Sequence, residues 1–549
     1  MNKPLFLLLC ASIGSGGLRA AAAPAVRELT LDKRFLNLPV KNKAPMQRVK
    51  LLVDGKVARE FDIELADREP DFWVFLDLSP FHGKRAILQA DTLPADSTAL
   101  SAINLADQIT GAEALYREAL RPQFHFSSRR GWNNDPNGLV FYRGEYHMFY
   151  QHNPYGWNWG NMHWGHAVSP DLVRWQELPI ALYPHQFGDW AFSGSAVVDR
   201  ANTAGFQTGK EAPLIAAYTS TGRGECIAFS NDRGRTWTEF NGNPVVCHKG
   251  RDPRLLWHRP TRRWVMAVYD EAEGKRWIAF YTSPNLKQWQ FESRIEGFYE
   301  CPDLFELPVD GKRSGKLWVL TAASSEYRLG TFDGRQFIPQ TPMLPGHKGD
   351  AFYAAQTFSD IPARDGRRIQ IGWGQVASPG MPFNQMMTFP CELTLRSTAA
   401  GPRLCLYPVK ELKRLYTTRH ARSGVTLAPG MNALAGISAD LLDLRAQFEV
   451  GTIGEVRLVV RGMPVVYDTA SKELVCAGRR NPLPPVKGKV RLRVLADRTS
   501  LEIFGNDGLL YMPMAAKFAA DDHTLALTAT GAPVRCDSLE VHKLKSMWP

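Results

Sequence analysis

The sequence predicts an all-β protein of several domains, the largest of which contains a repeated four-stranded unit. Three observations lead to this prediction. Short alternations of apolar and polar residues, separated by turn residues, run through most of the 549-residue chain, as in strands buried on one face. The chain is too long for one ordinary core. A turn signal also recurs at residues 169–171, 230–232 and 283–285 (Ser-Pro-Asp, Ser-Asn-Asp and Ser-Pro-Asn).

The first element is a secretory signal peptide, expected over residues 1–22. Lys3 precedes an apolar run at residues 4–13, and small residues follow, so cleavage is expected after Ala22. The run is too short to span a bilayer. Cys10 raises a lipoprotein alternative, but the bulky leucine before it argues against lipid attachment. We expect a secreted, periplasmic or cell-surface protein with no membrane span.

Residues 27–102 predict a small N-terminal β domain. Residues 49–53 (Val-Lys-Leu-Leu-Val), followed by Asp54-Gly55, indicate a strand and a tight turn. Residues 72–76 (Phe-Trp-Val-Phe-Leu) indicate a second strand. The apolar spacing in residues 103–120 favours a linker helix.

Residues 121–410 are rich in strands and aromatic side chains. Residues 139–142 and 146–150, joined by Arg143-Gly144, predict a hairpin. The recurring turns are 61 and 53 residues apart, each precedes a tryptophan, and residues 331–337 contain a degenerate fourth copy. This period matches a four-stranded propeller blade, and a β-sandwich with similar turns is the alternative.

Residues 420–549 return to alternating strands and predict a C-terminal β-sandwich. Residues 490–495 and 500–504 indicate two strands of a hairpin, and the turn signal Asn-Asp-Gly follows at residues 506–508. Residues 411–416 are expected to bridge this domain to the preceding one.

Composition excludes several classes of protein. The net charge of +11 comes from Lys and Arg residues spread along the chain, and no block of five basic residues occurs. We therefore expect a solvated basic surface and no nucleic-acid partner. The eight cysteines fall to seven after signal cleavage, and their spacing indicates no disulfide framework. A bridge between Cys226 and Cys247 remains a candidate.

Three acidic segments carry the predicted chemistry: residues 132–138 (Trp-Asn-Asn-Asp-Pro-Asn-Gly), 251–253 (Arg-Asp-Pro) and 300–302 (Glu-Cys-Pro). The first two place an aspartate directly before a proline and the third places a glutamate two residues before one, each in a separate repeat. One such pair alone is usually a turn. Three of them favour an enzyme that cleaves sugars, because glycosidic bond cleavage uses one ionised and one protonated carboxyl group.

Asp135 is predicted to be the nucleophile. The proline that follows it holds its backbone extended. Asn134 and Asn137 offer amide donors that favour the ionised carboxylate.

Glu300 is predicted to be the acid/base, because flanking Tyr299 and Cys301 indicate a less polar setting that raises a carboxyl pKa. Asp252, beside Arg251, is expected to stay ionised and to accept hydrogen bonds from sugar hydroxyls.

In this order and separation, the three segments resemble the signature motifs of glycoside hydrolase family 32, which includes invertases, inulinases and levanases. The likeness extends to residues 125–126, 150–154, 159–160, 163–166, 192–195, 352–356, 372–373, 497–498 and 501–504. It covers residues 121 to the end. The resemblance implies a five-bladed β-propeller with a funnel-shaped active site, followed by a β-sandwich. Ser127-Ser128 departs from the proline that often precedes the first motif.

The resemblance also implies a retaining mechanism on β-D-fructofuranosides, with Asp135 as nucleophile, Glu300 as acid/base and Asp252 as transition-state stabiliser. It implies sugar contacts by Asn134, Gln151, Trp159, Phe192, Ser193, Arg251, Tyr353 and Trp373. Its own neighbours place Trp159 on an exposed loop, whereas Trp175, in the repeated turn, is expected in a core. The N-terminal β domain lies outside the family pattern and receives no role from it.

Other residues admit a different chemistry. Four histidines raise the alternative of a metal site: His147, His152, His163 and His166. Their spacing is not a standard zinc pair, so packed histidines and no metal or other cofactor are expected. Cys301 lacks a Cys–His–Asn pattern and is expected to pack beside Glu300 or to tune its pKa.

The preferred hypothesis is a secreted, exo-acting fructan hydrolase that releases fructose from levan, inulin or sucrose. Two alternatives stay open. A fructosyltransferase would use the same three acids with a sugar as acceptor, and a fructan-binding surface protein would have lost catalysis. The sequence leaves linkage preference, exo or endo action and oligomeric state undecided.

Overall fold

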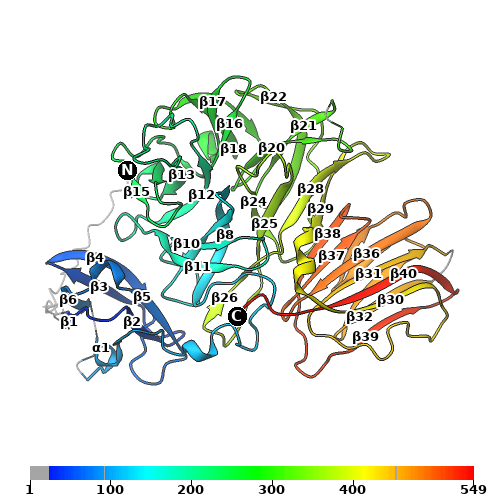
Figure 1. Ribbon diagram of the computed structural model, residues 1–549, viewed down its shortest axis with the longest axis horizontal. Coiled ribbons are helices and arrows are strands. Elements are labelled where there is room, and N and C mark those ends of the chain that lie inside the picture. Colours follow the sequence, from blue (N-terminus) through cyan, green and yellow to red (C-terminus); the bar gives the residue numbers. More distant parts are fainter. Residues whose placement is uncertain (1–23, 92, 95, 313, 452–453) are drawn as a thin grey trace, which may run out of the picture.

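The computed structural model describes residues 24–549, apart from residues 92, 95, 313 and 452–453. The expected signal peptide and Cys10 therefore lie outside the described residues. Strands dominate the described part of the chain and form three all-β units that follow one another along the sequence (Figure 1). The predicted fold class is confirmed.

The N-terminal unit consists of two small sheets with the strand orders β1-β6-β3-β4 and β5-β2-β7. The strands are β1 (Ala25–Thr30), β2 (Phe35–Val40), β3 (Gln47–Val53), β4 (Lys56–Ile63), β5 (Phe72–Asp77), β6 (Arg85–Ala90) and β7 (Asn104–Ala106). The predicted turn between β3 and β4 is confirmed, because Asp54 and Gly55 take left-handed φ angles of 52° and 75°. Buried leucine, valine and phenylalanine side chains form its core.

The linker helix expected over residues 103–120 is wrong. The short helix α1 (Ala99–Ala102) ends before this segment, and β7 pairs with β2. Gly111 then takes a φ angle of 75°, a left-handed conformation that ends helical geometry, and only the 3₁₀ turn Ala112–Ala114 follows. The first residues of the segment therefore form their backbone hydrogen bonds with β2 of the sheet and not within a helix.

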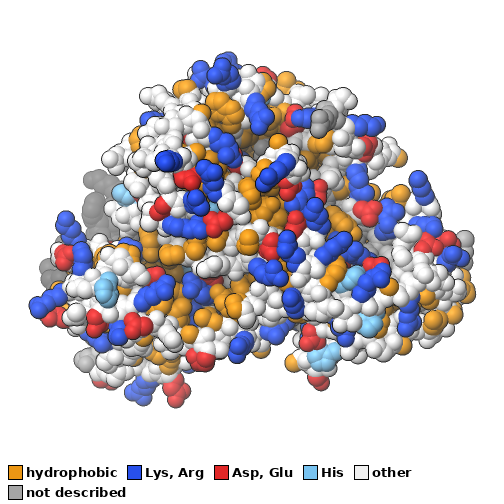
Figure 2. All heavy atoms as spheres, viewed as in Figure 1, with side chains coloured by type: hydrophobic (Ala, Val, Ile, Leu, Met, Phe, Trp, Pro, Cys, Tyr) orange, Lys and Arg blue, Asp and Glu red, His pale blue; other side chains and the backbone are white. Residues whose placement is uncertain are grey.

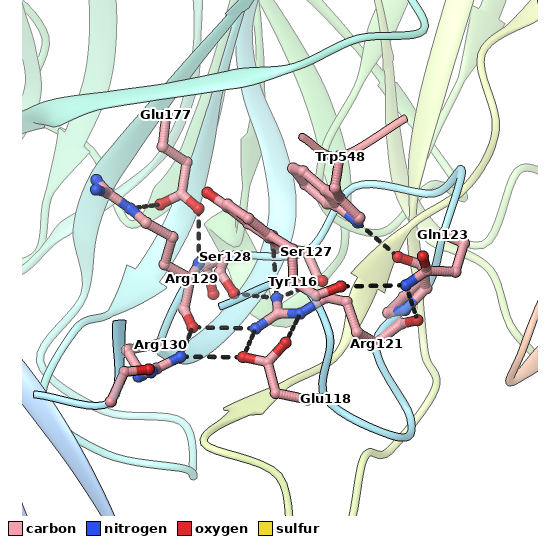
Figure 3. Close-up of polar contacts among 12 residues, drawn as sticks. Tyr116, Glu118, Arg121, Gln123, Ser127, Ser128, Arg129, Arg130, Glu177 and Trp548 are labelled. Atoms are coloured by element: carbon pink, nitrogen blue, oxygen red, sulfur yellow. Dashed lines mark hydrogen bonds and ion pairs between the residues drawn. The ribbon is translucent and has the colours of Figure 1, made fainter. Parts of the chain in front are cut away.

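The linker ends on a buried arginine that joins it to the propeller (Figure 3). The Arg121 guanidinium donates to both Glu118 oxygens at 2.9 and 2.8 Å and to Ser127 Oγ at 2.8 Å. Ser127 belongs to the pair that departs from the family's proline, so the departure supplies an acceptor for a buried charge. Trp548, near the C-terminus, covers this network by stacking on Tyr116, with 4.2 Å between the ring centroids.

Five sheets, each built on four successive main strands, form the blades of the propeller (Figure 1). In chain order the blades are β8 (Gly131–Tyr142), β9 (Glu145–Asn153), β10 (His163–Ser169) and β11 (Gln176–Leu182); β12 (Ala191–Val198), β13 (Leu214–Ser220), β14 (Gly224–Ser230) and β15 (Thr238–Glu239); β16 (Gly250–His258), β17 (Arg263–Asp270), β18 (Trp277–Ser283) and β19 (Gln290–Glu296); β20 (Asp303–Pro308), β21 (Lys316–Thr321), β22 (Tyr327–Phe332) and β23 (Phe337–Pro339); and β24 (Tyr353–Thr357), β25 (Arg368–Gly374), β28 (Cys391–Arg396) and β29 (Arg403–Pro408). Two short strands, β26 (Phe383–Asn384) and β27 (Met386–Met387), pair with β8 and β25. The first strands of the blades contact one another in turn, and β24 contacts β8, which closes the ring.

The recurring turns join the third and fourth strands of blades 1 to 4. In blade 1, Asp171 Oδ1 accepts hydrogen bonds from the backbone N–H groups of Val173 and Arg174 at 3.1 and 2.9 Å. Equivalent bonds are made by Asp232, Asn285 and Asp333. A side-chain oxygen that accepts from N–H groups two to four residues on stabilises such a turn. The fourth copy is confirmed as part of blade 4, and the sandwich alternative for this region is wrong.

The C-terminal unit is a sandwich of two sheets, β30-β40-β31-β36-β37-β38 and β35-β34-β33-β32-β39. Its strands are β30 (Tyr416–Leu427), β31 (Leu442–Glu449), β32 (Glu455–Val460), β33 (Met463–Asp468), β34 (Glu473–Cys476), β35 (Arg479–Pro482), β36 (Lys489–Ala496), β37 (Ser500–Gly505), β38 (Leu510–Ala515), β39 (Leu525–Ala529) and β40 (Val534–Leu544). The predicted hairpin is β36–β37, and the Asn-Asp-Gly turn joins β37 to β38. The 3₁₀ helix Lys410–Leu415 bridges the sandwich to the propeller.

Three motif residues far apart in sequence meet between these two units. His125 Nδ1 lies 2.8 Å from an Asp497 oxygen, and its Nε2 lies 3.2 Å from Glu502 Oε1. All three side chains are buried. Burial alone would lower the pKa of His125, but the hydrogen bonds and charges of the two acids raise it to about 9. A buried ion cluster therefore fixes the start of the propeller against the sandwich.

Surface and cysteine predictions can also be compared with the structure. On the face drawn in Figure 2, Lys and Arg side chains are scattered among acidic ones. The seven described cysteines are all free, so the Cys226–Cys247 bridge is not formed. Within the described residues, no helix is both long and apolar enough for a membrane crossing.

Candidate active site

The inner strands of four blades are irregular near their first residues. The pairing register shifts between Asn133 and Pro136 in β8, Ala191 and Gly194 in β12, Arg251 and Arg254 in β16, and Tyr353 and Gln356 in β24. Bulges change the direction of side chains and are frequent beside active sites. The prolines after Asp135 and Asp252 contribute, since proline cannot donate to the sheet ladder. The sequence thus breaks the strand alternation where the acids stand.

Backbone strain gathers at the same place. Asp252, Glu300, Cys301 and Ala354 have φ angles of 68°, 54°, 42° and 49°. This left-handed region is uncommon for residues other than glycine, and it persists where the surrounding structure imposes it. The strain therefore marks a site whose geometry is fixed by its neighbours.

The Asp135 carboxylate, on β8, is held from two sides. Ser193 Oγ donates to Oδ2 at 2.6 Å, and Asn134 Nδ2 donates to Oδ1 at 2.9 Å. Burial raises the pKa of Asp135, the bonds from Ser193 and Asn134 oppose that rise, and the charge of Glu300 adds to it. The expected donation from Asn137 is wrong, because its side-chain amide has no hydrogen-bond partner among the described residues.

Asp252, on β16, shares the thiol of Cys301 with Asp135. The Cys301 backbone N–H donates to Asp252 Oδ2 at 3.0 Å, and its Sγ lies 3.4 Å from this oxygen and 3.6 Å from Asp135 Oδ2. Burial raises the pKa of the thiol, which keeps it a proton donor. Burial and the nearby charge of Asp135 raise the pKa of Asp252 to about 7. The direction of this shift opposes the expectation that Asp252 stays ionised.

Glu300 lies in the loop before β20. It accepts hydrogen bonds from Arg251, the residue that was expected to keep Asp252 ionised. Arg251 donates to Glu300 Oε1 through Nε at 3.0 Å and through Nη2 at 2.5 Å. Tyr353 donates its hydroxyl to Glu300 Oε2 at 2.8 Å. The predicted less polar setting of Glu300 is wrong, since a charge and a hydroxyl hold both oxygens. The site thus combines three carboxyl groups, one of them oriented by a guanidinium.

A buried polar chain behind Asp252 was not predicted. The Asp252 N–H donates to Thr219 Oγ1 at 2.9 Å, and Thr219 donates to Glu225 Oε2 at 2.8 Å. His248 Nε2 lies 2.8 Å from the other Glu225 oxygen, and Nδ1 lies 3.4 Å from Asp270. The available signal was an acidic residue inside the otherwise apolar strand β14.

The remaining predicted sugar contacts line this cluster or support it. Trp159 is 53% exposed, and its ring lies 6.0 Å from that of Phe192 in an edge-to-face arrangement. Trp373 contacts Tyr353 in the same way at 6.1 Å. Gln151 is buried and donates to the Ala191 carbonyl at 2.9 Å, so it supports the strand that carries Phe192.

The four histidines raised as metal ligands are packed inside blade 1. His147 Nδ1 and His166 Nε2 lie 3.1 Å apart, and His152 Nδ1 lies 2.7 Å from the Trp132 carbonyl oxygen. Burial lowers the pKa of His152 to about 4 and that of His163 to about 3. Among the residues that the structure describes, no three His, Cys, Asp or Glu side chains are arranged to hold a metal ion.

A large cavity lies elsewhere. It encloses about 1070 Å³ and includes Val198, His258 and Asp360 in its lining, at or beyond the last residues of inner strands β12, β16 and β24. None of the three acids lines it. The hydrogen-bonded acids and the backbone strain place the candidate site at the other end of these strands.

Comparisons with known proteins agree with this architecture. Residues 125–408 match the Glycosyl hydrolases family 32 N-terminal domain, and residues 411–543 match the Glycosyl hydrolases family 32 C terminal domain. Residues 23–122 match a Domain of unknown function (DUF4980).

Among curated proteins, a levanase from Bacillus subtilis (strain 168) is 42% identical over 489 residues, which span 79% of this chain and 72% of the levanase. An extracellular exo-inulinase from Aspergillus ficuum is 31% identical over 522 residues, 79% of this chain and 96% of its own. Among solved structures, exo-inulinase from Aspergillus awamori has a TM-score of 0.72 at 28% identity, covering 79% of this chain and all of its own.

Proposed function

The chain belongs to glycosyl hydrolase family 32, and on that premise we propose that it hydrolyses β-D-fructofuranosidic bonds in fructans and releases fructose from the chain end. The carrying observation is the hydrogen-bonded cluster itself. Cys301 contacts both Asp135 and Asp252, and Glu300 precedes it in the chain. Levan, inulin and sucrose are the proposed substrates. One relative is named a levanase and another an exo-inulinase, so both kinds of fructan are included.

The proposed reaction retains configuration in two displacements. Asp135 attacks the anomeric carbon while Glu300 gives its proton to the leaving oxygen, so the glycosidic bond breaks as the fructosyl ester forms. Glu300 then takes a proton from water, the water oxygen bonds to the anomeric carbon, and Asp135 leaves as a carboxylate. The bonds from Ser193 and Asn134 support Asp135 as an anion in both steps.

Asp252 is proposed to accept hydrogen bonds from the fructose hydroxyls. Positive charge that develops on the ring favours its ionised form, so stabilisation grows toward the transition state. Arg251 and Tyr353 orient Glu300 at the distances already given. The proposed sugar contacts are Asn134, Gln151, Trp159, Phe192, Ser193, Arg251, Tyr353 and Trp373.

The test is chromatography of products released from levan, inulin and sucrose over time, with the Asp135→Asn variant beside the parent. We expect fructose as the first product and a loss of about 10³-fold or more in the variant. Asp171→Asn is the matched control, because Asn285 makes the same turn in blade 3. Near-parent turnover in Asp135→Asn would refute the assignment.

Two further outcomes separate the alternatives. Longer oligosaccharides built at high sucrose would indicate a fructosyltransferase, and fructan binding without product would indicate an inactive binding protein. NMR of the earliest fructose from a β-fructofuranoside tests retention, for which the β anomer must appear first.

We further propose that the protein is exported. The charged residue, apolar run and small residues within residues 1–22 support export, and one relative is named an extracellular exo-inulinase. N-terminal sequencing of the exported chain tests cleavage after Ala22.

A further inference from the structure

The N-terminal unit, which matches a domain of unknown function, packs beside the β10–β11 part of blade 1 (Figure 1). Its strand β4 is the edge of a four-stranded sheet. An edge strand presents unpaired backbone groups that need partners. Two propeller loops contact this sheet: residues 154–161 pair with the β4 backbone, and residues 183–190 contact arginine side chains of β3 and β4.

The first loop completes the edge of β4 with a side chain. Asn161 Oδ1 accepts from the Asp62 backbone N–H at 3.0 Å, and Asn161 Nδ2 donates to the Asp62 carbonyl at 2.8 Å. One amide thereby imitates the pairing of a neighbouring strand. Asn161 takes a φ angle of 40°, which asparagine tolerates better than most residues.

The same loop also contributes to the hydrophobic core of the N-terminal domain. Tyr155 stacks on Phe61 of β4 with ring centroids 3.7 Å apart and planes 17° apart. Tyr155 is 1% exposed and belongs to that core, and Trp157 packs against it. The loop is therefore folded into the domain as part of its core.

The second loop is held by cations. The Arg59 guanidinium of β4 lies 3.7 Å from the Tyr183 ring centre, and the Arg48 guanidinium of β3 lies 3.6 Å from that of Phe187. Cation–π contacts at this distance are attractive, and more so when partly desolvated. Both loops therefore depend on the same two strands, β3 and β4.

Each loop leads directly to the candidate active site. Trp159, in the first loop, is 53% exposed and faces Phe192. The second loop runs into β12, where Ser193 donates to Asp135 at 2.6 Å. The Trp157 carbonyl also accepts from Asn384 at 3.1 Å, in the short strand β26 beside β8.

We propose that the N-terminal domain is a positioning module for the fructosyl site: β3 and β4 hold the loops that carry Trp159 and lead to Phe192 and Ser193. The proposal rests on the proposed function. The domain is proposed to strengthen substrate binding. When the loops are held in the binding conformation, a larger fraction of the enzyme molecules is ready to bind substrate. The bond-making step itself uses only propeller residues.

The experiment uses full-length variants and steady-state kinetics on a fructan. Phe61→Leu keeps most of the volume but removes the stack on Tyr155, and Arg59→Ala removes the contact with Tyr183. We expect KM to rise about three- to tenfold and kcat to change less than about twofold. The matched control is Arg27→Ala, because Arg27 donates to the carbonyls of Leu100 and Ile103 inside the same domain. Its KM is expected to match that of the parent.

A double-mutant cycle separates positioning from general destabilisation. If Phe61 acts through Trp159, Phe61→Leu has less than about twofold effect on KM in a Trp159→Ala background. Equal effects in both backgrounds, or KM values for Phe61→Leu and Arg59→Ala that equal the Arg27→Ala value, would overturn the proposal.

Hydrogen exchange provides a readout that does not depend on activity. We expect faster exchange in residues 154–161 for Phe61→Leu and in residues 183–190 for Arg59→Ala, with no change for Arg27→Ala. Unchanged exchange in both loops would refute the positioning role even for an active enzyme. A parent chain that releases no fructose would instead refute the proposed function.

Discussion

Asp252→Asn is predicted to lower activity strongly while making the folded protein more stable above neutral pH. The carboxyl group is 6% exposed, and its pKa is raised from 3.8 to about 7 by burial and by the charge of Asp135. Asparagine keeps the shape, accepts the Cys301 N–H through its oxygen and tolerates the left-handed φ of 68°. The substitution therefore removes the charge with little change in packing.

The magnitude follows from proton linkage. Between pH 3.8 and about 7 the folded state binds a proton that the unfolded state has released, so stability falls as pH rises through this window. A shift of roughly three pKa units corresponds to about 4 kcal/mol, at about 1.4 kcal/mol per unit. The neutral amide of the variant carries no such penalty. Its advantage over the parent is about zero near pH 4 and reaches its full size above pH 7.

Thermal unfolding of parent and variant between pH 4 and pH 8 measures this difference, and fructose release measures activity. We expect the Tm of Asp252→Asn to exceed that of the parent by an amount that grows with pH and levels off above pH 7. The kcat should fall about 10²–10³-fold. Asp171→Asn, in the turn for which Asn285 is the equivalent residue in blade 3, provides the control. A constant Tm difference at every pH, or a variant that is less stable at pH 8, would refute the linkage argument.

Three other perturbations test neighbouring parts of the structure. The pKa of His125 is raised to about 9, which adds about 3 kcal/mol of stability that is fully present below pH 6.5 and is lost as pH rises through 9. The parent's Tm should therefore fall between pH 6 and pH 9.5, and His125→Asn should make this fall smaller. An equally steep fall in the variant would contradict this prediction. Tyr353→Phe removes the hydroxyl bound to Glu300 Oε2 and should lower kcat about tenfold at unchanged Tm; an unchanged kcat would remove Tyr353 from the site. Thr219→Val breaks both bonds of the buried chain behind Asp252 and should lower stability by about 1–3 kcal/mol in denaturant titrations, whereas an equal midpoint would show that the chain is not needed.

The sequence predicted the features that depend on local chemistry. The recurring turns identify blades because the side-chain oxygen and the N–H groups from which it accepts lie within a few residues. The fifth blade lacks this turn and came only from the family resemblance. The linker helix failed because apolar spacing ignores Gly111 and the pairing of β7 with β2.

Local reasoning about the acids failed where side-chain direction decides the partner. Arg251 and Asp252 are adjacent on β16, where the register shift and the left-handed backbone of Asp252 turn the two side chains toward different partners. Arg251 therefore reaches Glu300, in the loop before the next blade, and leaves Asp252 to the amide of Cys301. Sequence neighbours predicted residues that the structure brings together, but they gave the wrong pairs among them.

The placement of strain and charge follows from how the propeller is built. Four inner strands are irregular near their first residues, so side chains from separate blades converge there without the regular ladder that would bind their backbones. This geometry leaves Asp252 buried, in a left-handed conformation and close to Asp135, which is unfavourable for folding. Clusters remote from the acids offset it, as His125 does between propeller and sandwich.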